Sequence, residues 1–247
     1  MPQPRLRMLG LVALLLVVPR LASAEGIALN WSACEADGGF SNITFACNTN
    51  AGFSALAPSF LLDAPLTGVT SVRGTLDVVS ETPALPAWWD LDVCRSGSLT
   101  TLNTALAPIL CTYWATGILV NNGIDSYVTG LGGPNTARCE FRSFVRAAGV
   151  SLSSNTEYVV TALRFNFNRT VGSPSCSGCG IGVCLELKSL QLQLGTGPTF
   201  VNLTTPMPTA DGSHVTWQGG GSGPNGSCAG AVATRRSAWG AIKSLYR

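Results

Sequence analysis

Charged side chains are scarce in this 247-residue sequence: Asp, Glu, Lys and Arg make up 11% of it, whereas 46% of the residues are hydrophobic. The basic residues form no cluster beyond the pair Arg235-Arg236. Nucleic acids and anionic membrane surfaces are bound through clustered Lys and Arg side chains, so we expect neither as a partner. The hydrophobic content is sufficient for a sizeable core, and Ser, Thr, Asn and Gly must fill most exposed positions.

Histidine and catalytic motifs are also nearly missing. The one histidine, His214, is not accompanied by a Gly-x-Ser-x-Gly elbow, so a hydrolytic Ser-His-acid triad is not indicated and we interpret His214 as a strand or loop residue. Paired carboxylates of the kind used in glycoside hydrolysis can be remote in sequence, and nothing selects a pair among the 13 acidic residues. We expect no cofactor and no metal.

Long apolar runs are absent except at the N-terminus. Met8–Val18 is an unbroken apolar run of 11 residues that follows Arg5 and Arg7 and precedes the small-residue pattern Ala22-Ser23-Ala24. This order is typical of a cleavable export signal, and the run is too short for a transmembrane helix, which needs about 20 residues. Residues 1–24 are therefore predicted to be a signal peptide, and the mature chain is expected to begin at Glu25.

Cleavage changes the charge of the chain. Of the 15 basic residues, Arg5, Arg7 and Arg20 leave with the signal, so 12 basic and 13 acidic groups remain and the formal net charge is −1. We expect a secreted protein, whether extracellular, periplasmic or at the cell surface, with no membrane insertion after cleavage.

Apolar and polar residues that alternate with period two predict β-strands. This alternation is clear in Val72–Val78, Ala137–Arg146, Leu163–Asn168 and Val183–Leu194. In the last segment the alternation breaks near Lys188-Ser189, which favours a β-bulge over two strands joined at Ser189. Weaker strand candidates are Gly26–Trp31, Ile43–Cys47, Ser54–Leu62, Trp88–Cys94, Tyr127–Thr129, Thr199–Leu203 and His214–Trp217, with Asn121-Asn122-Gly123 and 132–135 as turns.

These strands predict an all-β protein: a two-sheet antiparallel sandwich, jelly-roll-like and stapled by disulfides. Residues 25–247 are expected to form a single domain with a C-terminal appendage from about residue 219. Helical periodicity is short, with one candidate over Leu102–Ala107 and a short C-terminal helix that begins near Ser237.

Nine cysteines in an exported chain indicate disulfides, with one thiol left over. The short separations predict the pairs Cys34–Cys47 and Cys94–Cys111. The other bonded cysteines are expected to be Cys176, Cys179, Cys184 and Cys228, with the pairing among them open. Zinc binding or a redox-active Cys-x-x-Cys is the alternative use of this cluster, with His214 or Cys228 as an additional zinc ligand, but exported thiols are usually oxidised.

Cys139 is the expected free thiol. It lies 28 residues from the nearest other cysteine, in mid-strand, on the same face as Phe141 and Val145. If that face is the core, the thiol is a small apolar filler. The alternative is an exposed thiol that dimerises the protein.

The sequence Trp88-Trp89-Asp90-Leu91-Asp92 is the only candidate for a ligand site. Adjacent residues of a strand point to opposite faces, so one tryptophan is expected in the core and the other outside. An outward ring beside Asp90 or Asp92 is compatible with carbohydrate stacking. Trp88, Trp89, Asp90 and Asp92 are therefore the predicted ligand-binding residues.

Four regions of the sequence are similar to segments of other proteins: Phe45–Asn50, the cysteine cluster Cys176–Leu185, Val215–Gly220 and the closing Trp239–Arg247. Together they resemble a group of uncharacterised secreted proteins from environmental bacteria. The resemblance covers most of the mature chain and implies export and a bacterial source. It brings no activity, ligand or catalytic residue with it.

The leading functional hypothesis is a secreted or cell-surface, non-enzymatic module with a binding or structural role, whose partner is a glycan or another surface protein. The alternative is a secreted hydrolase that uses paired carboxylates on a jelly-roll scaffold. Two carboxyl groups about 5–10 Å apart in an open groove lined by aromatic residues would favour the enzyme.

Overall fold

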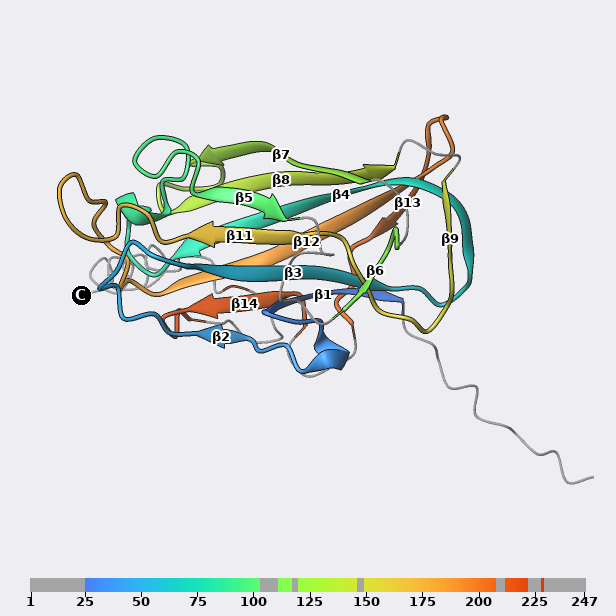
Figure 1. The fold of residues 1–247 in the computed structure, drawn as a ribbon, viewed down its shortest axis with the longest axis horizontal. Helices are drawn as coiled ribbons and strands as arrows, with labels where there is room; N and C mark the ends of the chain where they lie inside the picture. The colour runs from blue at the N-terminus through green and yellow to red at the C-terminus, as the bar shows by residue number, and fades with distance from the viewer. Residues whose placement is uncertain are drawn as a thin grey trace, which may run out of the picture.

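A computed structural model describes residues 25–102, 111–116, 120–145, 149–207, 212–221 and 228. These residues form two β-sheets that pack face to face (Figure 1). The predicted signal peptide (1–24), the C-terminal helix, most of the helix candidate at 102–107 and most of the appendage lie outside the described residues. Within those ranges, no helix has the length and hydrophobicity needed to cross a bilayer.

The smaller sheet has the strand order β5–β11–β3–β10–β6, with β1 also paired to β3. Its strands are β1 (Gly26–Trp31), β3 (Phe53–Leu61), β5 (Leu99–Leu102), β6 (Thr112–Tyr113), β10 (Tyr158–Val159) and β11 (Ala162–Asn166). The larger sheet has the order β2–β14–β12–β4–β8–β7, with β13 paired to β12 and β9 to β4. Its strands are β2 (Asn42–Ile43), β4 (Leu66–Ser80), β7 (Val120–Thr129), β8 (Thr136–Val145), β9 (Val150–Leu152), β12 (Val183–Leu194), β13 (Thr199–Leu203) and β14 (His214–Trp217).

The predicted all-β, disulfide-linked two-sheet sandwich is confirmed. All described strand pairs are antiparallel except β10–β6 and β14–β2. Along β4 and β8 the alternation places one set of residues in the core between the sheets and the other set on the outer face, as expected for strands with one wet face. Tryptophans fill much of this core: Trp31, Trp88, Trp89, Trp114 and Trp217 are each at most 2% exposed.

The irregularity in β12 is a bulge within one strand. Its register against β4 shifts between Leu187 and Ser189, while pairing continues on both sides. The extra residue keeps Leu187 and Leu190 on the same buried face, so the three-residue step between them does not invert the core pattern. The predicted bulge is confirmed.

Two local predictions in the larger sheet are wrong. The strand expected over Ile43–Cys47 is limited to β2, which covers Asn42–Ile43. The segment Asn121-Asn122-Gly123 is part of β7, not a turn, and pairs with β8. The Asn122 amide is used in tertiary contacts: its Nδ2 donates to the Leu102 carbonyl (3.5 Å) and its Oδ1 accepts from the Tyr113 hydroxyl (3.3 Å). Long-range pairing therefore overrides the turn preference of this sequence.

The smaller sheet has a second, smaller set of buried residues on its outer face. Small side chains of β3 and β11, together with Val159, are buried there in a second cluster: Cys34, Ala55, Ala57, Val159 and Ala162, with Phe53, Leu102, Cys111 and Tyr113 packed against it. Along β4 and β8 the outer face of the larger sheet is different, since it presents polar and charged side chains such as Arg73, Arg138 and Arg142.

Four disulfides link segments that are distant in sequence: Cys34–Cys111, Cys47–Cys179, Cys94–Cys176 and Cys184–Cys228. The predicted local pairs Cys34–Cys47 and Cys94–Cys111 are wrong. In a sandwich with crossover connections, neighbours in sequence lie on different strands, and the bonded partners are 44 to 132 residues apart. By the chain-entropy model, a closed loop of about 100 residues contributes roughly 4–5 kcal/mol to stability.

Cys139 is a free thiol and is fully buried in β8. Burial raises its pKa to about 12, with smaller contributions from Glu140 and Asp125. The thiolate needed for alkylation is therefore scarce at pH 8, and reagent access is blocked as well.

We expect Cys139 to resist iodoacetamide at pH 8 in the native protein and to react fully in denaturant. Mass spectrometry without reduction measures this as a gain of one alkyl group, because the other eight cysteines are bonded. Rapid native labelling, or a dimer that dissociates on reduction, would contradict the buried position.

A glycine in β4 makes room for an aromatic ring of the neighbouring strand. Gly74 faces Phe141 across the β4–β8 ladder, and a Cβ atom on Gly74 would overlap the Phe141 ring. Both residues lie on the core side, where Phe141 is fully buried. The ring cannot withdraw without displacing its neighbours in the core.

Gly74→Ala is expected to lower the free energy of unfolding by roughly 1–3 kcal/mol, because overpacking displaces Phe141. Urea denaturation followed by tryptophan fluorescence measures it. Gly123→Ala is the matched control in the same sheet, since a Cβ atom added there would meet no described atom within 4 Å beyond its chain neighbours. Its expected effect is within about 0.5 kcal/mol. Equal losses in the two variants would refute this account.

Candidate functional site

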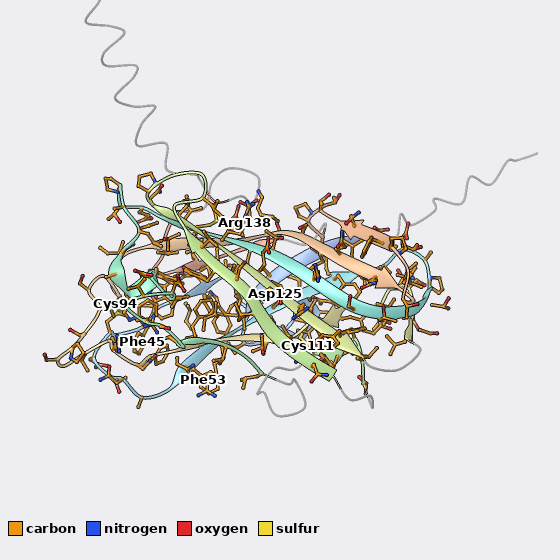
Figure 2. All side chains as sticks on the ribbon, turned by 90° about the horizontal axis from the view of Figure 1, so that it is seen from above. Phe45, Phe53, Cys94, Cys111, Asp125 and Arg138 are labelled. Atoms are coloured by element: carbon orange, nitrogen blue, oxygen red, sulfur yellow. A yellow bond between two sulfur atoms is a disulfide. The ribbon has the colours of Figure 1, made fainter. Side chains whose placement is uncertain are left out.

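The outer face of the larger sheet carries an open groove of about 310 Å³, where β4 and β8 meet the β12–β13 hairpin. The groove is lined by Thr70, Ser71, Arg73, Arg142, Phe144, Val145, Gln193, Gly195 and Thr196. Figure 2 views the molecule from the side of β7 and β8 and shows Asp125 and Arg138 on this sheet. We call this feature the β4–β8–β12 groove.

Strand register brings these residues together from three distant parts of the sequence. Ser71 is paired with Phe144 of β8 on one side and with Gln193 of β12 on the other. Two residues further along β4, Arg73 is paired with Arg142. Because side chains alternate between the two faces of a strand, all five point to the outer face, opposite the core residue Val72.

The guanidinium groups form one side of the groove and differ in their partners. Arg142 forms an ion pair with Asp125 (Nε to Oδ1, 2.8 Å), and its guanidinium carbon lies 5.5 Å from the centre of the Phe144 ring. Arg73 is exposed, and it takes part in none of the ion pairs between described residues. Arg73 therefore has hydrogen-bonding capacity available for a ligand.

The opposite part of the groove offers amide and hydroxyl groups in fixed positions. Ser71 donates to Gln193 Oε1 (3.0 Å), and Gln193 Nε2 donates to the Gly197 carbonyl (3.2 Å). Thr70 donates to the Gly195 carbonyl (2.7 Å). These bonds hold the side chains on a rigid sheet and hairpin, which reduces the entropy lost when a ligand binds.

A larger hollow of about 440 Å³ is a weaker candidate. It lies near β6, β9 and β10 and includes Tyr113 and Tyr158. Its lining residues include no charged side chain, whereas the β4–β8–β12 groove contains Arg73 and Arg142.

The site predicted at Trp88, Trp89, Asp90 and Asp92 does not lie on a strand, contrary to the prediction. Ala87–Trp89 form a 3₁₀ turn, η2, in place of a strand, with the Trp89 N–H bonded to the Pro86 carbonyl (2.8 Å). Both tryptophans are fully buried, so the expected outward ring is wrong. A tight turn does not place successive side chains on opposite faces as a strand does. Without an outward ring, Asp90 and Asp92 have no stacking surface beside them here.

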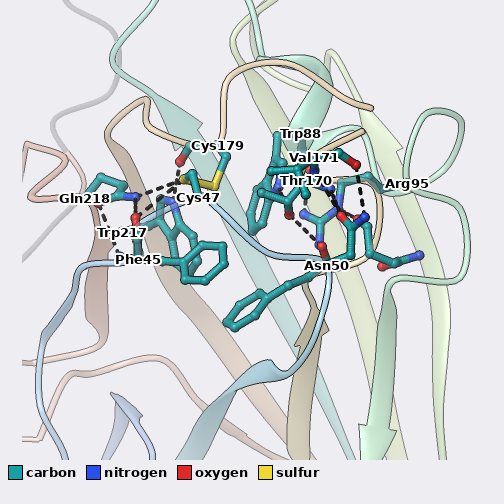
Figure 3. Close-up of a disulfide and its surroundings, with 12 residues drawn as sticks. Phe45, Cys47, Asn50, Trp88, Arg95, Thr170, Val171, Cys179, Trp217 and Gln218 are labelled. Carbon is teal, nitrogen blue, oxygen red and sulfur yellow. Dashed lines mark hydrogen bonds between the residues drawn. A yellow bond between two sulfur atoms is a disulfide. The ribbon is translucent and has the colours of Figure 1, made fainter. Parts of the chain in front are cut away.

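Trp88 belongs to a cross-linked end of the sandwich, which Figure 3 shows together with Trp217 and the Cys47–Cys179 disulfide. The Trp88 ring stacks on Trp217 (centroids 4.9 Å apart), and Trp217 Nε1 donates to the carbonyl of Cys179, which is bonded to Cys47. Figure 2 shows Cys94 and Phe45 at this same end. The cluster is a structural feature, since it fills the core below the loops.

Arg95 is a buried charged residue at this end of the sandwich. It is fully buried, with its guanidinium 3.5 Å from the centre of the Trp88 ring. It donates to the carbonyls of Trp88 (2.9 Å), Asn168 (3.1 Å) and Asn166. Burial lowers its pKa to about 9, so it still carries its charge at neutral pH. It joins the loop after η2 to the segment that follows β11.

The cysteine cluster is not assembled as a metal or redox site. Cys176 and Cys179 are bonded to different distant partners, and so is Cys184. Among the described residues, the only grouping of possible metal ligands contains Cys34 and Cys111, which are bonded to each other. His214 lies buried in β14, opposite Glu186 of β12.

Carboxylates do not form the pair that the hydrolase alternative requires in this groove. None of its lining residues is acidic. Glu25 and Asp63 are hydrogen-bonded to each other elsewhere, and burial raises the pKa of Glu25, with a further contribution from Asp63. The hollow beside Glu25 is lined by residues without aromatic rings: Gly26, Asn202, Leu203, Thr204 and Thr205.

Comparisons of the chain with protein-family models, with curated proteins and with solved structures found no match.

Arg95→Lys is expected to lower the free energy of unfolding by roughly 3 kcal/mol or more, because the single nitrogen of an ammonium group cannot reach three carbonyls that are bound by three different nitrogens of the guanidinium group. Denaturant titration with near-ultraviolet circular dichroism measures the loss. Arg169→Lys is the control, since Arg169 is exposed and donates to one carbonyl, that of Cys94. A loss no greater than that of the control would show that Arg95 is not required.

Proposed function

We propose that this chain is a secreted or cell-surface, non-enzymatic binding module that holds a carbohydrate in the β4–β8–β12 groove. Export is supported by the N-terminal signal pattern and by four disulfides, which are typical of proteins outside the reducing cytoplasm. The site belongs to the larger sheet, whose outer face is polar and uncovered along β4 and β8.

The composition of the groove is the observation that carries this proposal. Arg73 supplies N–H groups that are free within the described part of the chain, and the Gln193 amide keeps a second N–H beside the one bonded to a backbone carbonyl. The hydroxyl oxygens of Ser71 and Thr70 can accept, and Phe144 supplies an aromatic ring beside them. A sugar presents hydroxyl groups at its edge and C–H groups on its face, so this mixture of polar and aromatic side chains suits it. A few polar groups in fixed positions within a concave site are typical of small-molecule and polymer binding.

A protein partner is less well supported. A stable protein interface buries about 800 Å² on each partner and has an apolar centre. The exposed large apolar residues of the described structure are dispersed over several segments: Phe40, Val93, Val128, Leu131 and Phe200. Hydrolysis is not supported, because a glycosidase places two carboxyl groups beside the bond it cleaves and the groove contains none.

The test is a glycan-array screen of the mature protein, followed by co-sedimentation with insoluble polysaccharides. We expect binding to at least one polysaccharide and no release of reducing ends from any. Gln193→Ala and Phe144→Ala should each weaken binding at least fivefold, whereas Lys188→Ala, on the same face outside the groove, should not. Absence of binding, or release of reducing sugars by the pure protein, would contradict the proposal.

A further inference from the structure

Two like charges face each other at the β4–β8–β12 groove. Arg73 and Arg142 occupy directly opposed positions on adjacent strands, where side chains begin about 5 Å apart. Like charges in such positions destabilise a sheet. The arrangement therefore lowers stability unless an anion is bound between the two guanidinium groups.

Among its described residues, the protein itself neutralises the charge of only one of these two arginines. Asp125, at the bulge of β7, forms an ion pair with Arg142. Arg73 has Gln191 of β12 as its other cross-strand neighbour, and an amide cannot neutralise it. Within the described residues, one positive charge of the pair is left without an ion-pair partner.

On the outer face of the larger sheet, the acidic residues of β4 and β8 lie on the side of the two arginines that is away from the groove. Glu140 precedes Arg142 by two residues, and Asp77 is paired with Arg138 still further along β8 (2.7 Å). None of them lines the groove, which extends from the arginines in the opposite direction, towards Ser71, Phe144 and Gln193. A ligand in the groove thus meets guanidinium groups before it meets any carboxylate.

We propose that the ligand of this groove is an acidic saccharide, whose carboxylate or sulfate group binds between Arg73 and Arg142. A guanidinium group presents parallel N–H donors that match two oxygens of such an anion, and the bond is stronger than one to a neutral hydroxyl. Gln193, Ser71 and Phe144 then contact the neutral part of the sugar. This inference rests on the proposed function and specifies its ligand class.

The test compares polysaccharides that differ only in charge. Polygalacturonate is compared with its methyl-esterified form, and dextran sulfate with dextran, by affinity electrophoresis of the mature protein at 50 and 300 mM NaCl. The first pair reports on carboxylates and the second on sulfates. We expect at least tenfold stronger binding of the acidic member in one pair, and weaker binding at the higher salt concentration because exposed charges are screened.

Variants separate a specific site from general charge attraction. Arg73→Gln is expected to reduce binding of the acidic member at least tenfold, and Arg73→Lys to restore only part of it, because an ammonium group lacks the planar fork. Lys188→Gln removes the same charge from the same face outside the groove and should retain binding. Thermal denaturation should show Arg73→Gln folded, since Arg73 contributes no ion pair among the described residues.

The outcomes distinguish this inference from the proposed function. Equal binding within both pairs, or array binding confined to neutral glycans, would overturn the acidic ligand and leave carbohydrate binding in place. Equal losses in Arg73→Gln and Lys188→Gln would also overturn it, since the attraction would then be unspecific. No binding to any polysaccharide or glycan would overturn both.

Discussion

The antiparallel pairing of β4 with β12 on one side and β8 on the other determines both faces of the larger sheet. Through this register Val72 and Leu76 enter the core while Ser71 and Arg73 reach the outer face. A slip of one residue would exchange the two faces, placing an arginine between the sheets. The core therefore fixes the register, and the fixed register assembles the groove. Stability and the candidate site depend on one set of backbone hydrogen bonds.

The opposite end of the sandwich is held in another way. There the buried guanidinium of Arg95 donates to the carbonyls of Trp88 in η2, of Asn166 at the end of β11 and of Asn168 just after it. The disulfide Cys94–Cys176 joins the loops that follow η2 and β11. Cys47–Cys179 adds a second link beside Trp217. The mobility expected of long loops is thus suppressed at this end by covalent and polar contacts.

Strand patterns in the sequence predicted much of the fold, because alternation reports directly which face is buried. The bulge in β12 was visible for the same reason, as a three-residue step between Leu187 and Leu190. Segments whose structure is determined by distant partners could not be predicted. Asn121–Gly123 reads locally as a turn and is a strand because β8 pairs with it. Disulfide partners follow the crossover topology, which spacing does not encode.

The groove, too, depends partly on local sequence patterns and partly on contacts between distant segments. Arg73 and Arg142 occupy polar positions in the alternating segments Val72–Val78 and Ala137–Arg146, but nothing in the sequence indicated that β4 and β8 would bring them opposite each other. Trp88 and Trp89 form an adjacent aromatic pair in the sequence, which predicted a surface site, and both are core residues. Pro86 precedes the pair, and the 3₁₀ turn that follows it buries both side chains.

The disulfide pattern has a consequence for biosynthesis. The segments 34–111, 47–179 and 94–176 each close at Cys111 or later, so no native bond among these three can form before Cys111 has been synthesised. Local non-native bonds, such as Cys34 with Cys47, are available earlier. Correct oxidation therefore requires exchange among thiols whenever such a bond has formed. The sheet that buries Cys139 removes the last free thiol of the chain from that exchange, so after folding no cysteine of the protein itself is free to attack the bonds.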